Sequence, residues 1–148
     1  MHVRYAASAR PVVRPRWVWL AVALEVLTAL GAIPVGAMLL ADPSGGTAGL
    51  PRSWIESSVF GSYFVPGLYL LFVNGFGMLA LAGLTVRRQW LAPWLTGTLG
   101  VGLIVWIAVE IVVLPETSFL TWTFLATGVA LGFLALAWLR VAGQLRLW

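Results

Sequence analysis

The sequence predicts an all-α membrane protein folded as a four-transmembrane-helix bundle, and three observations predict it. Hydrophobic residues make up 61% of the chain and charged residues only 9%, whereas soluble domains carry about 25% charged residues. Four apolar stretches are each long enough to cross a bilayer core, which requires about 20 helical residues. Arginines flank these stretches and none lies inside them. Spans this apolar cannot be strands of a membrane barrel, because the lipid and lumen faces of such strands alternate.

The chain divides into a cytoplasmic tail over residues 1–16 and a single transmembrane domain over residues 17–148. Two prolines in the tail disfavour a helix that extends far from the membrane. The first span is expected over residues 17–41, where Glu25 is the only ionisable side chain. A secretory signal is disfavoured, because the apolar core of such signals is only about 7–15 residues long.

The connection over residues 42–62 is the longest polar stretch between spans. It opens on the turn sequence D-P-S-G-G, which ends the first span. Residues 50–58 predict a short extracytoplasmic helix with Pro51 in its first turn. Two interpretations stay open for this helix. We favour an amphipathic helix on the membrane surface, and the alternative is a lid over a cavity between the spans.

The other three spans are expected over residues 63–86, 90–114 and 119–139. Their short connections make them antiparallel neighbours in a compact bundle. Cytoplasmic connections of membrane proteins carry an excess of arginine and lysine. Both termini and the turn between the second and third spans are therefore placed in the cytoplasm. The arginines on that side are Arg4, Arg10, Arg14, Arg16, Arg87, Arg88, Arg140 and Arg146, against Arg52 alone on the other.

Two buried polar residues are expected at the same depth in the bilayer. Glu25 follows Trp17 by eight residues and Asn74 follows Pro66 by eight, which places each about 12 Å from opposite membrane edges. A carboxylate at mid-span costs about 2.5–3.5 kcal/mol, so Glu25 should face other helices. We expect the Asn74 amide to be its partner, with Thr28 as another candidate.

A second group of candidate binding residues is expected near the outer membrane edge. Glu110 lies five residues before Pro115, and Tyr69 and Trp122 reach a similar depth on neighbouring spans. Glu25 and Glu110 differ in height by more than a helical turn, so they do not form a pair of catalytic carboxylates.

The composition excludes most kinds of catalytic and metal site. The chain has no cysteine and one histidine, His2, which excludes disulfides, thiolate metal sites, haem cages and a Ser-His-Asp triad. All nine basic residues are arginine, so no lysine completes a phosphate-binding loop. We therefore expect no catalytic residue, no cofactor and no metal, and we favour a non-enzymatic protein. A carboxylate acid–base enzyme acting on a lipid stays open. Nucleic acid is not expected as a partner, since the arginines flank the spans instead of forming a patch.

Three roles are open for Glu25: a hydrogen-bonded carboxyl that fixes helix pairing, a proton-coupled binding site, or the polar base of a lipophilic pocket. The sequence thus favours an accessory subunit or a bundle that binds a lipophilic ligand. The alternative is a proton-coupled small-molecule transporter that uses Glu25. The lipid bilayer is the expected partner, and membership of a larger membrane complex or a homodimer stays open.

Three stretches carry a resemblance: A-L-E-V-L-T-A-L-G-A-I-P-V-G, L-L-A-D-P-S-G-G-T-A-G-L-P and V-P-G-L-Y-L-L-F-V-N-G-F-G. They resemble uncharacterised small four-span bacterial membrane proteins that are loosely DoxX-like. The resemblance implies a multi-pass protein of the bacterial cytoplasmic (inner) membrane, and it implies no particular activity. The motif A-L-E-V is also similar to the small multidrug resistance transporters, in which a first-helix glutamate binds protons and cationic drugs. That likeness extends to Glu25 only, and the long connection after the first span departs from it.

Overall fold

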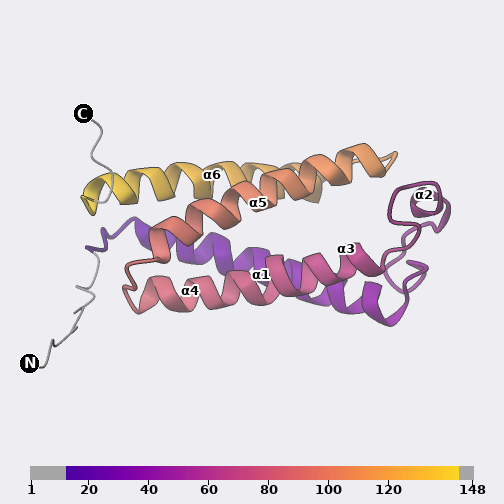
Figure 1. Ribbon diagram of the computed structural model, residues 1–148, viewed down its shortest axis with the longest axis horizontal. Helices are drawn as coiled ribbons and strands as arrows, with labels where there is room; N and C mark the ends of the chain where they lie inside the picture. The colour runs from indigo at the N-terminus through magenta and orange to yellow at the C-terminus, as the bar shows by residue number, and fades with distance from the viewer. Residues whose placement is uncertain (1–12, 144–148) are drawn as a thin grey trace, which may run out of the picture.

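The computed structural model describes residues 13–143, and these form a bundle of four long helices (Figure 1). The long helices are α1 (Val18–Ala41), a second span over Phe64–Val86, α5 (Ala92–Val113) and α6 (Phe119–Val141). Each is long and apolar enough to cross a membrane, and the described residues contain no strand. The predicted four-helix membrane bundle is confirmed, with span boundaries close to those expected from hydropathy. The predicted tail over residues 1–16 lies mostly outside the described residues.

The second span is not a uniform α-helix. It consists of α3 (Phe64–Leu68), a π-helix, η1 (Tyr69–Gly77), and α4 (Met78–Val86). A π-helix has i→i+5 hydrogen bonds and is often found at functional sites. Asn74 lies within η1 and is buried. The sequence analysis did not predict this segment, and it changes the direction in which side chains of the second span point.

Glycines bring α1 and the second span into backbone contact. A Cβ atom on Gly36 would lie 2.6 Å from the backbone nitrogen of Leu71, and a Cβ on Gly75 would lie 2.7 Å from Cγ1 of Ile33. Real Cβ atoms do not approach other atoms so closely. Small residues allow such helix approach in membranes, so α1 and the second span form one tightly packed unit, the first hairpin.

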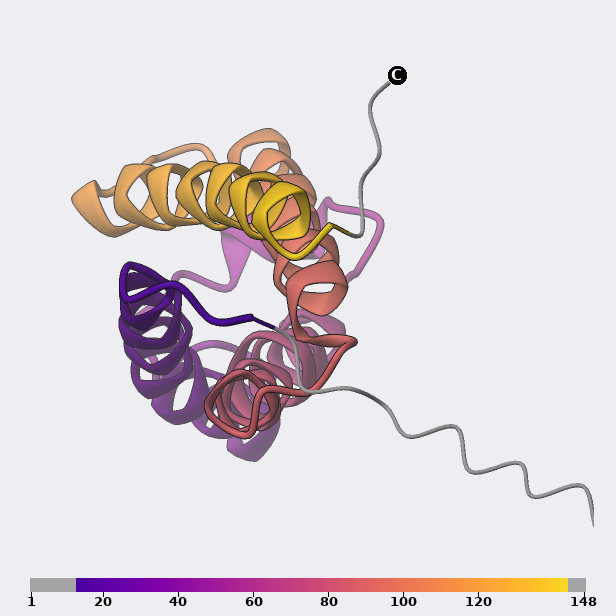
Figure 2. The same ribbon diagram turned by 90° about the vertical axis from the view of Figure 1, so that its left-hand side faces the viewer.

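The helices α5 and α6 form a second hairpin by the same means. A Cβ on Gly128 would lie 2.9 Å from the carbonyl oxygen of Gly100, whereas a Cβ on Gly132 would meet nothing within 4 Å. Figure 2 shows the two hairpins end-on, with α5 and α6 together above α1 and α4. Contacts within each hairpin are more extensive than contacts between them.

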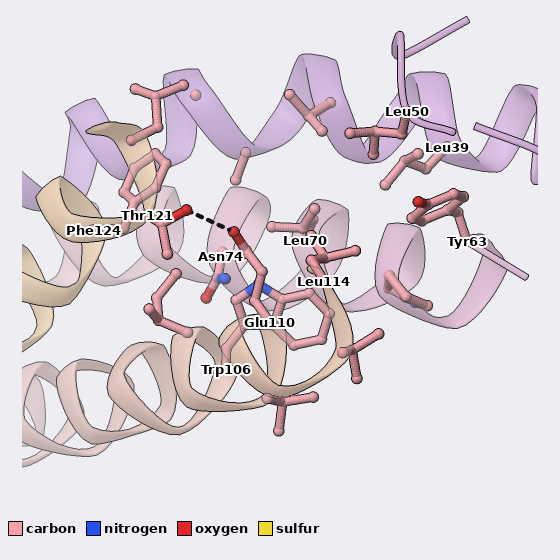
Figure 3. Close-up of a pocket in the computed structure, with 18 of the residues that line it drawn as sticks. Leu39, Leu50, Tyr63, Leu70, Asn74, Trp106, Glu110, Leu114, Thr121 and Phe124 are labelled. Atoms are coloured by element: carbon pink, nitrogen blue, oxygen red, sulfur yellow. Dashed lines mark hydrogen bonds between the residues drawn. The ribbon is translucent and has the colours of Figure 1, made fainter. Parts of the chain in front are cut away.

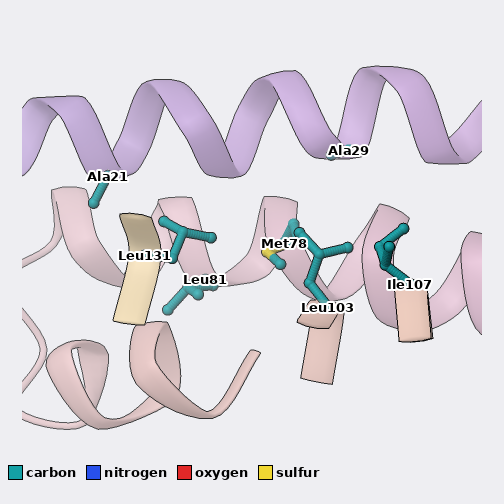
Figure 4. Packing of buried hydrophobic residues seen from close by; sticks show 7 residues of the cluster. All are labelled: Ala21, Ala29, Met78, Leu81, Leu103, Ile107 and Leu131. Atoms are coloured by element: carbon teal, nitrogen blue, oxygen red, sulfur yellow. The ribbon is translucent and has the colours of Figure 1, made fainter. Parts of the chain in front are cut away.

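The main core lies between the two hairpins. It contains one residue from α6, two from each of α1 and α5, and two from the second span (Figure 4). These residues are Ala21, Ala29, Met78, Leu81, Leu103, Ile107 and Leu131. All are at most 2% exposed, so burial of this cluster holds the hairpins together along the middle of the bundle.

One end of the bundle, here termed the arginine end, carries the start of α1 and the end of α6. Arg14 donates a hydrogen bond to the carbonyl oxygen of Val86 at 3.0 Å and lies over the Trp19 ring. The indole nitrogen of Trp138 donates to the carbonyl oxygen of Val13 at 2.7 Å. The segment before α1 is thus tied to both hairpins.

The opposite end, the loop end, is covered by the connection between α1 and α3. The predicted helix over residues 50–58 is present as the shorter α2 (Ser53–Glu56). Its Ile55 is only 1% exposed and packs with Leu39 and Tyr63. The hydroxyl group of Tyr63 donates to the carbonyl oxygen of Pro51 at 3.0 Å. The connection therefore folds inward over the bundle, as the lid interpretation requires, although we favoured a surface helix from the sequence.

Candidate functional site

A cavity of about 280 Å³ lies between the two hairpins at the loop end (Figure 3). Its walls come from all four spans and from the connection that contains α2, and they are mostly apolar. Leu39, Leu70, Leu103, Leu114 and Phe124 are among the lining residues. Small-molecule sites in proteins are typically cavities of about 300–1,000 Å³ with few polar groups. The cavity is thus close to the lower limit of that range.

Two of the apolar residues that line the cavity, one on α1 and one on α6, are exposed at the surface of the bundle. Val35 on α1 and Leu120 on α6 both line the cavity, and these side chains are 39% and 60% exposed. On a transmembrane bundle such exposed apolar side chains face lipid. At the loop end, by contrast, Leu50, Ile55 and Tyr63 cover the cavity. The exposed Ser118 also lines the cavity at this end, and Val35 and Leu120 give the cavity a side that faces the bilayer.

Three polar side chains gather on one wall of the cavity. Glu110 on α5, Asn74 on η1 and Trp106 on α5 lie together in Figure 3. Asn74 is 2% exposed and its Oδ1 atom has no hydrogen-bond partner. The Nε1 atom of Trp106 also lacks a partner of good geometry, although it lies beside the Glu110 carboxyl group. Buried polar atoms without partners are rare in folded proteins, so these two mark the wall as a candidate binding site.

Glu110 is anchored to the start of α6. The hydroxyl group of Thr121 donates to Oε1 of Glu110 at 3.1 Å. Ser118 and Thr121 in turn form a capping box at the N-terminus of α6, so the carboxyl group is held by a well-defined helix end. Hydrogen bonds of this kind fix the orientation of a binding group before a ligand arrives.

Tyr69 supports this wall from behind. Its ring stacks on Trp106 with centroids 4.6 Å apart and an angle of 15° between the planes. Its hydroxyl group donates to the carbonyl oxygen of Gly102 at 3.1 Å, which links η1 to α5 across the two hairpins. Tyr69 is not itself among the cavity-lining residues, so its role is to position Trp106.

Glu25 lies outside the cavity, in the half of the bundle nearer the arginine end. Its side chain is 0% exposed, and Oε1 accepts a hydrogen bond from Thr96 at 3.0 Å. Oε2 has no partner in hydrogen-bonding geometry, and neither does the nearby buried hydroxyl group of Thr85. The expected pairing with Asn74 is wrong, and so is the pairing with Thr28, whose hydroxyl group donates to the carbonyl oxygen of Leu24.

The pairing error has a physical cause. Equal depth was the only criterion applied to Glu25 and Asn74, and depth does not determine which way a side chain points around its helix. Thr96 could have been found by the same argument, because it follows Trp90 by six residues and so lies about 9 Å from the cytoplasmic edge. Trp106 could have been found from its position one turn before Glu110, on the same face of the helix.

Trp122 lies away from both polar groups. It is 55% exposed and lines a second, shallower depression with Leu24 and Phe119 on the outer surface of the bundle. The structure therefore brings Asn74 and Glu110 together, places Tyr69 behind them, and separates Glu25 and Trp122 from them. Among the described residues, no group of three or more acidic or histidine side chains could hold a metal ion.

The likeness to DoxX-like proteins stays a prediction. Two polar groups stand out among the described residues: the cavity wall at the loop end and the enclosed Glu25 carboxyl. No protein-family model, curated protein or solved structure matches the chain.

Proposed function

We propose that the protein binds a lipophilic molecule in the cavity between its hairpins, as a non-enzymatic multi-pass protein of the bacterial inner membrane. The observation that supports this is an apolar cavity whose open side faces lipid and whose deeper wall carries unpaired polar atoms of Asn74 and Trp106. Apolar walls hold the body of a lipophile, while a few polar groups fix its orientation. A role as accessory subunit is compatible with this, since the bound molecule or the bundle itself could serve a larger complex.

The test is to identify what is bound when the protein is purified. Protein extracted in a mild detergent is analysed by native mass spectrometry for a bound lipophile, in the wild type and in Ala32→Leu. Ala32 lines the cavity and is 4% exposed, so the added methylene groups occupy ligand space. Ala37→Leu, on the exposed face of the same helix, is the matched control. We expect a bound molecule that is lost in Ala32→Leu and retained in Ala37→Leu, and an equal signal in both variants would contradict the proposal.

A proton-coupled transporter that uses Glu25 is the second candidate. The observation in its favour is a fully enclosed carboxyl group with one unpaired oxygen, since ionisable groups inside membranes are often functional. Against it, Glu25 is not among the residues that line the cavity. The transporter is tested by reconstituting the wild type or Glu25→Gln in liposomes, applying a proton gradient and measuring the flux of a small-molecule substrate. Proton-driven flux that disappears in Glu25→Gln supports the transporter, and equal flux, or none in either protein, eliminates it.

A further inference from the structure

We infer that the cavity selects a lipophilic amine, with its ammonium group between Glu110 and Asn74. This inference rests on the proposed function, since it names the chemical class of the bound molecule. It comes from counting which hydrogen-bond donors and acceptors of the cavity wall are already used, and from the charge that the wall carries.

The hydroxyl donors that line the cavity are already engaged within the protein. Thr28 donates to the carbonyl oxygen of Leu24 at 2.8 Å, Tyr63 to that of Pro51 at 3.0 Å, and Thr121 to Glu110 at 3.1 Å. The hydroxyl group of Ser118 lies 3.3 Å from that of Thr121 and accepts from the Thr121 backbone. None of these hydroxyl groups has a proton left for a ligand acceptor.

The acceptors, by contrast, exceed the donors. Oδ1 of Asn74 has no donor, and the carboxyl group of Glu110 receives one hydrogen bond, from Thr121. The donors on this wall are the indole N–H of Trp106, which lies beside Glu110, and the two N–H groups of the Asn74 amide. A carboxylate can accept about four hydrogen bonds. These three N–H groups fill fewer positions than Glu110 and Oδ1 of Asn74 offer, so a ligand that completes this wall donates hydrogen bonds, as an ammonium group does.

The charge of the wall leads to the same class of ligand. Glu110 is the only acidic residue that lines the cavity, and no arginine lines it. Arg52, in the covering connection, is paired with Glu56. A carboxylate in an apolar cavity is costly without a positive partner, and nothing in the described part of the chain supplies one. A ligand ammonium group does so, while its hydrocarbon body occupies the leucine-lined part of the cavity.

The experiment compares three molecules that share one hydrocarbon skeleton: adamantylamine, adamantanol and adamantane carboxylate. Their binding to the purified protein at neutral pH is measured by calorimetry. A hydrogen bond to a charged group contributes about 1 kcal/mol more than a neutral one, so we expect the amine to bind about 5-fold more tightly than the alcohol. The carboxylate should bind least, because its charge repels that of Glu110.

Two variants and one control test the residues that we assign. Glu110→Gln should abolish the preference for the amine over the alcohol. Asn74→Leu should weaken amine binding while leaving the protein folded, which keeps the inference testable if Glu110→Gln does not fold. Glu116→Gln removes an exposed acid that does not line the cavity, and it should preserve the preference. Helical circular dichroism and a single symmetric elution peak establish the folding of each variant.

The outcomes separate this inference from the proposal on which it depends. If the alcohol or the carboxylate binds as tightly as the amine or more tightly, the assignment of an amine ligand is wrong. The proposed binding function still stands in that case if a lipophile co-purifies with the protein. A preference for the amine that survives in Glu110→Gln overturns the assignment of Glu110. If none of the three molecules binds and no lipophile co-purifies, the proposed function itself fails.

Discussion

Thr96 donates a hydrogen bond to Glu25 across 3.0 Å, and this contact joins α5 of the second hairpin to α1 of the first. Together with the hydrogen bond from Tyr69 to Gly102, it connects the hairpins through polar groups as well as through the apolar core. Interhelical hydrogen bonds in membranes contribute about 0.6 kcal/mol on average. The hydrogen bond from Thr96 matters more than this average, because its removal would leave the buried Glu25 carboxyl group without a donor.

We therefore expect Thr96→Val to destabilise the protein by about 1–3 kcal/mol, the cost of leaving a buried polar group unpaired. Unfolding is followed by circular dichroism as a denaturing detergent is added to the folded protein. The control is Thr98→Val on the same helix, because the Thr98 hydroxyl group is exposed and donates only to the Trp94 carbonyl oxygen. Equal stability of the two variants would show that the contact between Glu25 and Thr96 contributes nothing to the fold.

The glycine contact between α1 and η1 gives a second prediction. Gly36→Ala places a methyl group 2.6 Å from the backbone of Leu71, and such overpacking costs about 1–3 kcal/mol. Gly83→Ala in α4 meets nothing within 4 Å and should stabilise its helix by up to about 1 kcal/mol. The same unfolding assay should therefore give changes of opposite sign. A tolerated Gly36→Ala would mean that the two helices do not approach as described.

Acid should loosen the start of the loop that covers the cavity. Asp42 accepts hydrogen bonds from Ser44 and Thr47, and these, with the Ser44 hydroxyl group foremost, lower the pKa of Asp42 from 3.8 to about 2. The lowered pKa means that the turn is stabilised fully above the ordinary pKa of Asp and loses that stabilisation as the pH falls towards 2.

The variant Asp42→Asn isolates this effect. Amide hydrogen exchange at Ser44 and Thr47 should be faster in the variant than in the wild type at about pH 5, where the wild-type carboxylate is ionised. The difference should shrink as the pH falls to about 2, where about half of the wild-type carboxylate is protonated. A difference that does not depend on pH would mean that the charge of Asp42 is not what holds the turn.

Single-cysteine labelling tests the predicted orientation, because the chain has no cysteine of its own. Val59→Cys lies in the loop-end connection, where the side chain is 94% exposed, and Gln89→Cys lies in the exposed turn at the arginine end. A maleimide that does not cross membranes should label Val59→Cys in intact bacterial spheroplasts and Gln89→Cys only after lysis. The reverse pattern would place the arginine end outside the cytoplasm.

Span number and span boundaries could be predicted because hydrophobic length is a one-dimensional property of the sequence. Each span boundary coincides with a proline, a charged residue or a turn sequence, as at Asp42 and Arg87. Side-chain direction around the helix axis could not be predicted in this way. Every span is apolar on all sides, so its pattern does not show which face meets a neighbour. The pairing of Glu25 with Thr96 depends on that direction.

The π-helix adds to the wrong pairing of Glu25 with Asn74, because Asn74 lies within it. An i→i+5 turn contains more residues than an α-helical turn, so Asn74 does not point where an α-helical second span would direct it. No residue type in Y-L-L-F-V-N-G-F-G specifies a π-helix by itself. The lid is one of two interpretations of residues 42–62, and the burial of Ile55 against Leu39 and Tyr63 is compatible with it.

The exposed lining residues Val35 and Leu120 have a consequence for how occupancy of the cavity would be controlled. For a molecule that enters from lipid, the occupancy of the cavity depends on its concentration in the hydrocarbon. Partitioning between water and the membrane sets that concentration. At the same concentration in water, each methylene group added to the molecule raises its concentration in the hydrocarbon about fourfold. A weak intrinsic affinity would thus be enough to fill the cavity with a molecule that accumulates in the membrane.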